Sequence, residues 1–207
     1  MIQFKNSDQS FKTVAVLMTN AICYGCGLDV TRTGIMIKLP SNFIMAFEGN
    51  PKGVDEILTF VPHSLMEFIA KDTWPTVLEF GERPITDAQT LRKKSKNDIS
   101  FQGESTHLIQ ELIIMSNFVY YYESVKDSIE KKYGQNPWQW PGTLNFARII
   151  RNAFAHGGKI NIKNPNDPPV HWKQYIYSHQ NNGQQIIPND INMPEIIFLL
   201  KEIDGLL

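Results

Sequence analysis

Four polar side chains interrupt an otherwise apolar stretch that runs from residue 146 to residue 158, FARIIRNAFAHGG. They are Arg148, Arg151, Asn152 and His156, and the whole chain has only five arginines. A guanidinium keeps its charge and offers a fork of donors that suits phosphate. An imidazole has a pKa close to neutral and can transfer protons. These residue types therefore indicate phosphodiester chemistry by acid–base catalysis and charge stabilisation, without a metal.

A helix over this stretch would separate the two kinds of side chain. At about 100° per residue, one side holds Phe146, Ile149, Ile150, Ala153 and Phe154. The opposite side holds Arg148, Arg151, Asn152, Ala155 and His156. Gly157 and Gly158 would let the chain turn away without covering the imidazole. The sequence therefore predicts an amphipathic helix with its polar stripe available to a ligand, or an ordinary solvated polar face.

The elements that must position this helix follow from apolar periodicity and capping residues. One long helix is predicted from Glu104 to Tyr133, closed by Gly134. Thr143 is expected to cap the helix that carries the stripe. After it, residues 170–187 read as a hairpin with its turn at NNG, 181–183. Asn192 and Glu195 have the spacing of a capping box, which predicts a final helix ending at Gly205.

The region before residue 86 reads as mostly helical. Residues 10–27 form an apolar run that Gly25 and Gly27 should end, and residues 53–60 and 62–72 look like short helices. A short hairpin is predicted around residues 35–47. We therefore expect a mainly α chain in two parts, an N-terminal extension over 1–85 packed on a helical domain over 86–207.

Composition excludes several classes of protein. With 207 residues, 42% of them hydrophobic, the chain can bury a core, and a net charge of -1 argues against coating nucleic acid by bulk charge. The N-terminus lacks a secretory pattern, and no apolar run is long enough to span a bilayer. We expect a cytoplasmic protein with no membrane association.

The segment RNAFAH, Arg151 to His156, resembles the signature of the HEPN superfamily, an Arg, a polar residue, three further residues and a His. The surrounding ARIIRNAFAHGG resembles its toxin-type bacterial members, which are often plasmid-borne. The resemblance covers about residues 104–207. It implies a HEPN-like helical bundle, to which the hairpin after the motif helix would be a small β-like insert.

By the same resemblance the chain is expected to be a metal-independent endoribonuclease, a toxin or antiphage effector, with no cofactor. Arg151 and His156 would be the catalytic pair and Asn152 the residue that positions them, while Arg148 is added from the wheel as a substrate-binding residue. The implied partners are RNA, a second copy of the chain, and an antitoxin or nucleotidyltransferase. The alternatives are a non-catalytic HEPN module that binds RNA, a nucleotide or a protein, and a purely structural helical protein.

Other groups that could do chemistry have simpler explanations. Cys23 and Cys26 have the spacing of half a zinc site, but no second pair follows, so we expect buried cysteines. The remaining histidines are expected to be structural or solvated; they are His63, His107, His171 and His179. The basic run at 92–96 is a solvated loop or a clamp for an RNA backbone. Trp138 and Trp140 either stack on bases or hold the loop onto the bundle.

Overall fold

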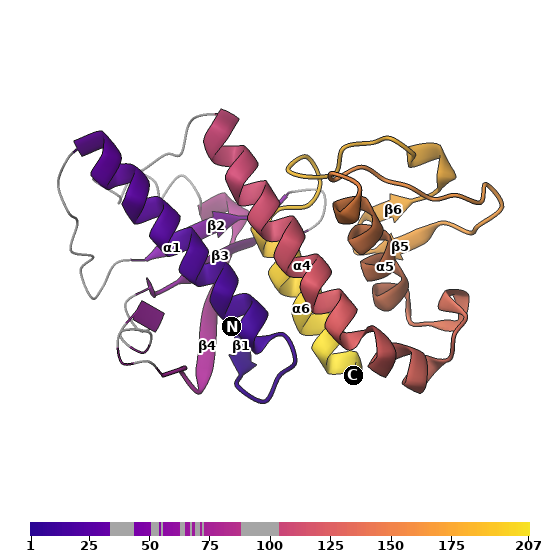
Figure 1. Cartoon of the computed structure of the whole chain (residues 1–207), viewed down its shortest axis with the longest axis horizontal. Helices are drawn as coiled ribbons and strands as arrows, with labels where there is room; N and C mark the ends of the chain where they lie inside the picture. Colours follow the sequence, from indigo (N-terminus) through magenta and orange to yellow (C-terminus); the bar gives the residue numbers. More distant parts are fainter. Residues whose placement is uncertain are drawn as a thin grey trace. The chain divides into compact units, whose positions relative to one another are not determined.

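A four-stranded antiparallel sheet forms in the N-terminal part of the chain, where the sequence predicts mostly helices (Figure 1). The computed structural model describes residues 1–33, 44–50, 54, 56–62, 65, 66, 68, 71, 73–87 and 104–207, without the side chains of 24–33, 85 and 104–107. A second sheet, of two strands, lies near the C-terminus. The fold is mixed α/β, and the prediction of a mainly α helical bundle is wrong.

The chain divides into two compact units. The first unit holds residues 1–48 and 56–113, and the second holds residues 49–55 and 114–207. The predicted boundary after residue 85 falls inside the first unit. The segment 49–55 belongs to the second unit although it lies among the strands of the first in sequence.

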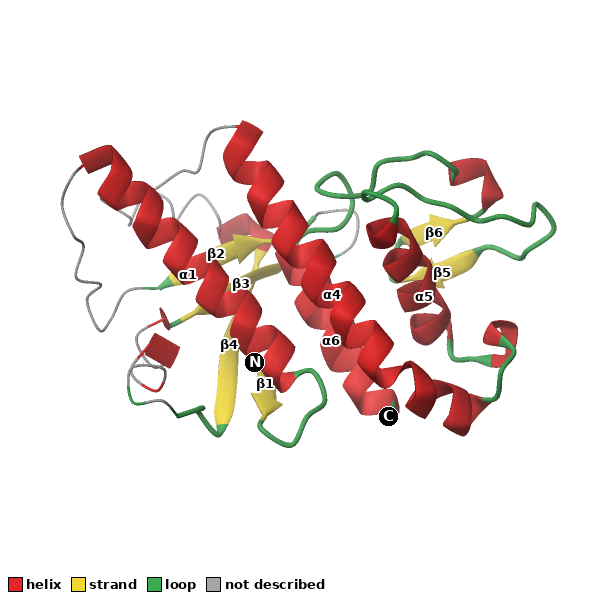
Figure 2. Cartoon of the chain, viewed as in Figure 1, coloured by secondary structure: helices red, strands yellow, loops and turns green. Residues whose placement is uncertain are grey.

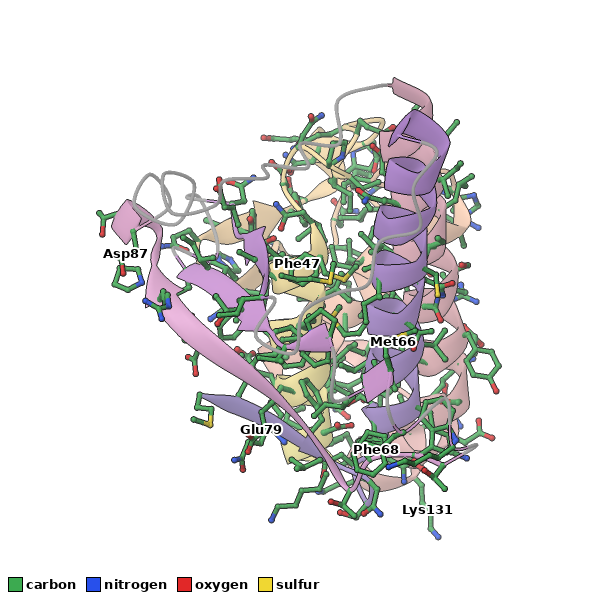
Figure 3. The ribbon with its side chains drawn as sticks, turned by 90° about the vertical axis from the view of Figure 1, so that its left-hand side faces the viewer. Phe47, Met66, Phe68, Glu79, Asp87 and Lys131 are labelled. Atoms are coloured by element: carbon green, nitrogen blue, oxygen red, sulfur yellow. The ribbon has the colours of Figure 1, made fainter. Side chains whose placement is uncertain are left out.

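The sheet of the first unit has the strand order β1-β4-β3-β2, with every neighbouring pair antiparallel (Figure 2). Its strands are β1 (Ile2–Lys5), β2 (Met45–Glu48), β3 (Glu56–Phe60) and β4 (Val77–Pro84), followed by the 3-10 turn η1 (Ile85–Asp87). Helix α1 (Phe11–Thr33) lies along one face of this sheet (Figure 3). Buried residues alternate with exposed ones in β1 and the start of β4, which is the period of a sheet with one buried face.

Exposed polar side chains cover the other face of this sheet. Gln3 donates a hydrogen bond from Nε2 to Glu79 Oε1 at 2.7 Å, between the paired strands β1 and β4. Glu79 lies on the side away from α1 (Figure 3). Phe4 and Phe80, by contrast, are fully buried with their rings 6.0 Å apart. The sheet is therefore two-faced, apolar inside and polar outside.

The prediction of a short helix over residues 53–60 is wrong, because strand β3 forms there. Strand β3 is EILTF and β1 is IQFK, and runs of four or five residues carry too few positions to distinguish a period of 2 from one of about 3.6. Tertiary pairing decides such segments. Helix α1 is longer than predicted, since it continues through Gly25 and Gly27 to Thr33. The first strand of the hairpin predicted around residues 35–47 lies outside the described residues.

Helices dominate the chain from residue 104 onward, and several of their predicted bounds are confirmed. Helix α4 runs from Glu104 to Tyr133, as predicted, and Gly134 follows it with a positive φ of 86°. The next elements are η2 (Pro137–Gln139), α5 (Gly142–Ala155), η3 (His179–Asn181) and α6 (Met193–Leu206). Thr143 is not the cap of α5, because Pro141 takes that position and the Thr143 hydroxyl donates to Glu202 instead.

The predicted hairpin exists, but its turn lies elsewhere. Strand β5 (Val170–Trp172) pairs with β6 (Tyr175–Tyr177), so the turn is at Lys173 and Gln174. Lys173 takes a left-handed φ of 50° there. The NNG segment instead follows η3, where Gly183 has a φ of 82°. Both observed strands lie in the part of the sequence before NNG, which was predicted as a single strand of the hairpin, and a two-residue turn without glycine gave no signal.

Aromatic rings join this hairpin to α5, beside which it lies in Figure 1. The Phe146 ring stacks on Trp172 at 5.3 Å and on Tyr177 at 5.5 Å between centroids. The Tyr177 hydroxyl donates to Asp190 Oδ2 at 3.0 Å. The hairpin is thus part of the core that supports α5, and none of the described helices is long and apolar enough to cross a membrane.

Candidate functional site

Helix α5 presents the predicted polar stripe. Its apolar residues are all buried, namely Phe146, Ile149, Ile150, Ala153 and Phe154. The residues of the opposite side are half-buried or exposed, and they are Arg148, Arg151, Asn152, Ala155 and His156. The separation read from the sequence is therefore confirmed. It fixes the direction in which the polar side chains leave the helix.

His156 occupies the C-terminal end of α5, with its side chain exposed. Its backbone N–H donates to the carbonyl of Ala153 at 3.0 Å. Its imidazole has no hydrogen bond or ion pair within the described part of the chain. Gly157 and Gly158 follow with φ of 71° and 81°, so the chain turns away at once in a left-handed conformation that favours glycine. The imidazole is accordingly free to meet a ligand.

Arg151 is more enclosed than His156. Its side chain is 31% exposed, and its Nε lies 2.5 Å from Glu123 Oε1 of α4, an ion pair without the geometry of a hydrogen bond. Its Nη1 donates to Asn152 Oδ1 at 3.1 Å. The neighbouring Arg and Asn of the motif are thus in contact. The guanidinium is held in place, and part of its charge is balanced by a carboxylate.

Arg148 lies one turn earlier on the same helix. Its Nε donates to Asn145 Oδ1 at 3.0 Å, and its guanidinium carbon lies 5.3 Å from the centre of the Trp138 ring. Burial lowers the pKa of Arg148, although the guanidinium remains charged at neutral pH. The Arg148 side chain is therefore held between the Asn145 amide and the Trp138 ring and does not extend freely into solvent.

Two residues of α4 complete the site, and sequence reasoning did not identify either. Glu123 supplies the carboxylate beside Arg151. Tyr122 is buried, and its hydroxyl has no hydrogen-bond partner among the described residues. Burial raises the pKa of Tyr122 well above its usual value, and the nearby charges of Arg148 and Arg151 oppose that rise. In the sequence, Tyr122 is only one of the apolar positions that repeat along the helix predicted over 104–133. That pattern does not show that Arg148 and Arg151 lie nearby.

The other candidates scatter over the molecule. Cys23 is a free, exposed thiol rather than a buried one, and the Cys26 side chain lies outside the description. His171 is exposed on β5, and His179 is half-buried in η3. His63, the His107 side chain and the basic run at 92–96 lie outside the described residues. Among the residues that are described, no three His, Cys, Asp or Glu side chains gather as a metal site.

The two tryptophans of the interhelical loop behave differently. Trp140 is buried, and its indole N–H donates to the carbonyl of Gly134 at 2.7 Å, so it holds the loop onto the unit as one of the two predictions states. Trp138 is 36% exposed and carries the Arg148 guanidinium. Only Trp138 is therefore available to a ligand.

Comparison with protein-family models gave no match, and neither known proteins nor solved structures gave one. The function must therefore be argued from the side chains of α4 and α5.

Proposed function

We propose that this chain is a metal-independent endoribonuclease of HEPN type that acts as a homodimer in the cytoplasm. Arg151 and His156 are its catalytic residues, Asn152 positions Arg151, and Arg148 binds substrate. The substrate is single-stranded RNA, whose 2′-hydroxyl supplies the nucleophile.

The observation that carries this proposal is the contrast between His156 and Arg151. The imidazole is exposed and unpaired within the described residues, as proton transfer to a bound substrate requires. The guanidinium, five positions earlier, is fixed by Asn152 and Glu123 before any substrate arrives. Pre-organised charge next to a free imidazole suits a reaction in which negative charge develops on phosphorus oxygens.

The reaction needs one base and one acid on opposite sides of a phosphate. In the proposed dimer, one His156 removes the proton of the 2′-hydroxyl, whose oxygen then attacks phosphorus. The bond from phosphorus to the 5′-oxygen breaks, and His156 of the second copy donates a proton to that leaving oxygen. The products are a 2′,3′-cyclic phosphate and a 5′-hydroxyl, and each arginine stabilises charge on the phosphate during the step.

The first test is RNA cleavage in EDTA by the full chain and by His156→Ala. The substitution removes an exposed side chain, so folding is expected to be unaffected, whereas cleavage should fall by about 100-fold or more. His171→Ala is the matched control, since it removes another exposed imidazole, from β5, and should leave cleavage unchanged. Equal cleavage by wild type and His156→Ala would overturn the assignment.

A toxin-type role predicts a cellular effect as well. Expression of the wild-type chain should slow bacterial growth, and His156→Ala should restore it. Relief by a co-expressed antitoxin, or silencing by a nucleotidyltransferase partner, would fit the same role. Growth inhibition of equal strength by both versions would contradict a toxin based on this site.

A second function is favoured by one specific contact. The carboxylate of Glu123 already occupies one edge of Arg151, which leaves less charge to stabilise a transition state. A non-catalytic module that binds RNA through the same stripe would tolerate this pairing. Binding of RNA without cleavage, unaffected by His156→Ala, would select this second function over the first.

A further inference from the structure

The segment over residues 158–163, which follows the candidate site, is bound along one edge by the chain that precedes α6. The backbone N–H of Ile160 donates to the carbonyl of Gln184 at 3.0 Å. The Asn182 side chain binds both backbone groups of Ile162, since it accepts from the N–H at 2.7 Å and donates to the carbonyl at 2.8 Å. The backbone of the even-numbered residues therefore holds this segment in place.

The odd-numbered residues of the segment face the other way. Ile160 and Ile162 are buried, whereas Lys159 and Lys163 are exposed and Asn161 is half-buried. Such alternation is typical of an extended chain with one buried face. Within the described residues, neither the backbone nor the side chains of the odd-numbered residues make a hydrogen bond or an ion pair. Two ammonium groups, an amide and one backbone edge are thus available to a ligand.

The start of this segment is fixed next to His156. Gln185 donates from Nε2 to the carbonyl of Gly157 at 3.2 Å, and the backbone N–H of the next residue donates to the carbonyl of Gly158 at 2.9 Å. These two glycines alone separate His156 from Lys159. A strand that leaves the His156 imidazole along this segment therefore meets the ammonium group of Lys159 first.

Acidic groups do not offset the charge of the two lysines. Asp167 is the only acidic residue of the sequence between residues 156 and 169, and its Oδ1 accepts a hydrogen bond from Asn164 at 2.9 Å. Asp190, in the stretch that follows η3, is buried and accepts from the Tyr177 hydroxyl. Neither carboxylate forms an ion pair with a lysine in the described part of the chain. An anion that reaches this surface therefore meets two uncompensated positive charges.

We propose that Lys159, Asn161 and Lys163 form a lysine track, which binds the RNA strand beside the phosphate cleaved at His156. The ammonium groups bind phosphate oxygens, and the open backbone edge offers N–H donors to phosphate and carbonyl acceptors to 2′-hydroxyl groups. The four steps from residue 159 to residue 163 of an extended chain span about 13 Å, the rise of about four stacked nucleotides. The lysine track rests on the proposed function, because it holds the same strand.

RNA length separates the lysine track from the cleavage site. Binding to the full-length His156→Ala chain is measured by fluorescence anisotropy with a labelled single-stranded RNA of about 12 nucleotides, and an unlabelled trinucleotide is the competitor. Adding Lys159→Gln and Lys163→Gln together should weaken binding of the longer RNA by about 10-fold at low salt. The slope of log affinity against log salt should fall by about 1.4, or about 0.7 for each lysine. The trinucleotide is too short to reach both lysines, so its affinity should fall less than about 2-fold.

The control removes two positive charges elsewhere. Lys12→Gln and Lys131→Gln together act at exposed positions of α1 and α4, and Figure 3 labels Lys131. This pair should change neither the affinity nor the slope by a comparable amount. All four lysines are exposed, so urea midpoints should stay at the wild-type value.

Two results would overturn the lysine track. Equal losses for the long RNA and the trinucleotide would show a general effect of charge. Unchanged affinity and slope for the long RNA would leave Lys159 and Lys163 as charges that keep an open edge from pairing with other chains.

The lysine track and the nuclease fail in different ways. Cleavage in EDTA that depends on His156, together with unchanged RNA binding in the lysine variant, overturns the track alone. Binding of the long RNA that depends on Lys159 and Lys163, without any cleavage by the wild-type chain, overturns the nuclease and supports the track as an RNA-binding surface. An RNA that neither binds nor is cleaved overturns both.

Discussion

In the proposed nuclease site, Glu123 would set the charge that an incoming phosphate meets at Arg151. Its side chain is 43% exposed, so solvent screens the pair and its contribution to folding is small. Its effect on a ligand is larger, because a carboxylate 2.5 Å from the guanidinium nitrogen also repels the phosphate that Arg151 would bind. In the proposed site, Glu123 therefore holds Arg151 in place and at the same time weakens the affinity of Arg151 for an anion.

Replacing Glu123 by Gln separates these two effects. Glu123→Gln keeps the shape of the side chain and removes its charge, so RNA binding should tighten by about 3- to 10-fold at low salt, with a smaller gain at high salt. Asp127→Asn makes the same charge change on α4 and should tighten binding less. Anisotropy titrations of both variants give the comparison, and weaker binding in Glu123→Gln would show that ordering outweighs repulsion.

The residues of α5 could be predicted from the sequence, whereas their partners on α4 could not. Arg151, Asn152 and His156 stand out because the polar and apolar positions of one helix separate cleanly. Glu123 and Tyr122 reach them across a helix–helix contact whose register depends on packing. A single sequence carries no direct record of that register. The positions of the Glu123 carboxylate and the Tyr122 hydroxyl beside α5 were therefore visible only in the three-dimensional structure.

At the scale of elements, two glycines form the turn that follows His156 at the end of α5. Gly157 and Gly158 both take left-handed φ values, but their surroundings differ. A Cβ on Gly157 would meet no atom within 4 Å, whereas one on Gly158 would lie 2.5 Å from Gln185 Nε2 and 2.7 Å from Ile187 Cγ2. The second glycine is therefore required for packing as well as for its backbone conformation.

Alanine substitutions should reveal this difference. Gly157→Ala should cost about 1 kcal/mol of unfolding free energy from backbone strain alone. Gly158→Ala should cost about 2–4 kcal/mol, because overpacking adds to the same strain. Urea unfolding followed by tryptophan fluorescence measures both. Equal losses in the two variants would mean that the contacts of residues 185 and 187 relax freely.

The start of α6 contains a fully buried carboxylate. Glu195 accepts hydrogen bonds from the backbone N–H of Asn50 at 2.7 Å and of Asn192 at 3.2 Å. Burial raises the pKa of Glu195 to about 7, and these backbone donors partly oppose the rise. The capping spacing of Asn192 and Glu195 was visible in the sequence, but the contact with residue 50, far away along the chain, was not.

Stability should therefore depend on pH through Glu195. At pH 6 the folded chain holds this proton while the unfolded chain, with a carboxyl pKa of about 4.5, has lost it. The contribution of Glu195 to the unfolding free energy consequently falls as pH rises from about 4.5 to about 7, by about 3 kcal/mol, and is constant outside that window. Glu195→Gln should flatten this part of the pH profile in urea unfolding. An unchanged profile would place the pKa of this carboxyl near its ordinary value.

At the scale of the whole molecule, long helices were predictable and the sheet was not. Helix α4 gives thirty residues of pattern, and its predicted bounds are those observed. Strands β1, β2 and β3 have four or five residues each. They become strands by pairing with their neighbours in the sheet, and β1 pairs with β4, which is far away along the chain. Such non-local pairing outweighs local periodicity, which is why a mainly helical chain was predicted.

The proposed mechanism requires two copies of the chain, because one His156 cannot serve both faces of a phosphate. We expect a native mass of twice the 23.7 kDa of the chain in light scattering. The cleavage rate per chain should also fall on dilution below the dimer dissociation constant. A monomer with full activity at every concentration would contradict the shared site.

The most direct measurement is the chemical identity of the cleaved ends. A defined single-stranded RNA is incubated with the chain in EDTA, and the fragments are analysed by mass spectrometry. A matched strand with one 2′-deoxynucleotide at the cleavage position should stay intact. We predict one fragment ending in a 2′,3′-cyclic phosphate and one beginning with a 5′-hydroxyl, both absent with His156→Ala. Fragments with a 3′-hydroxyl and a 5′-phosphate, or cleavage of the deoxy-substituted strand, would contradict the account.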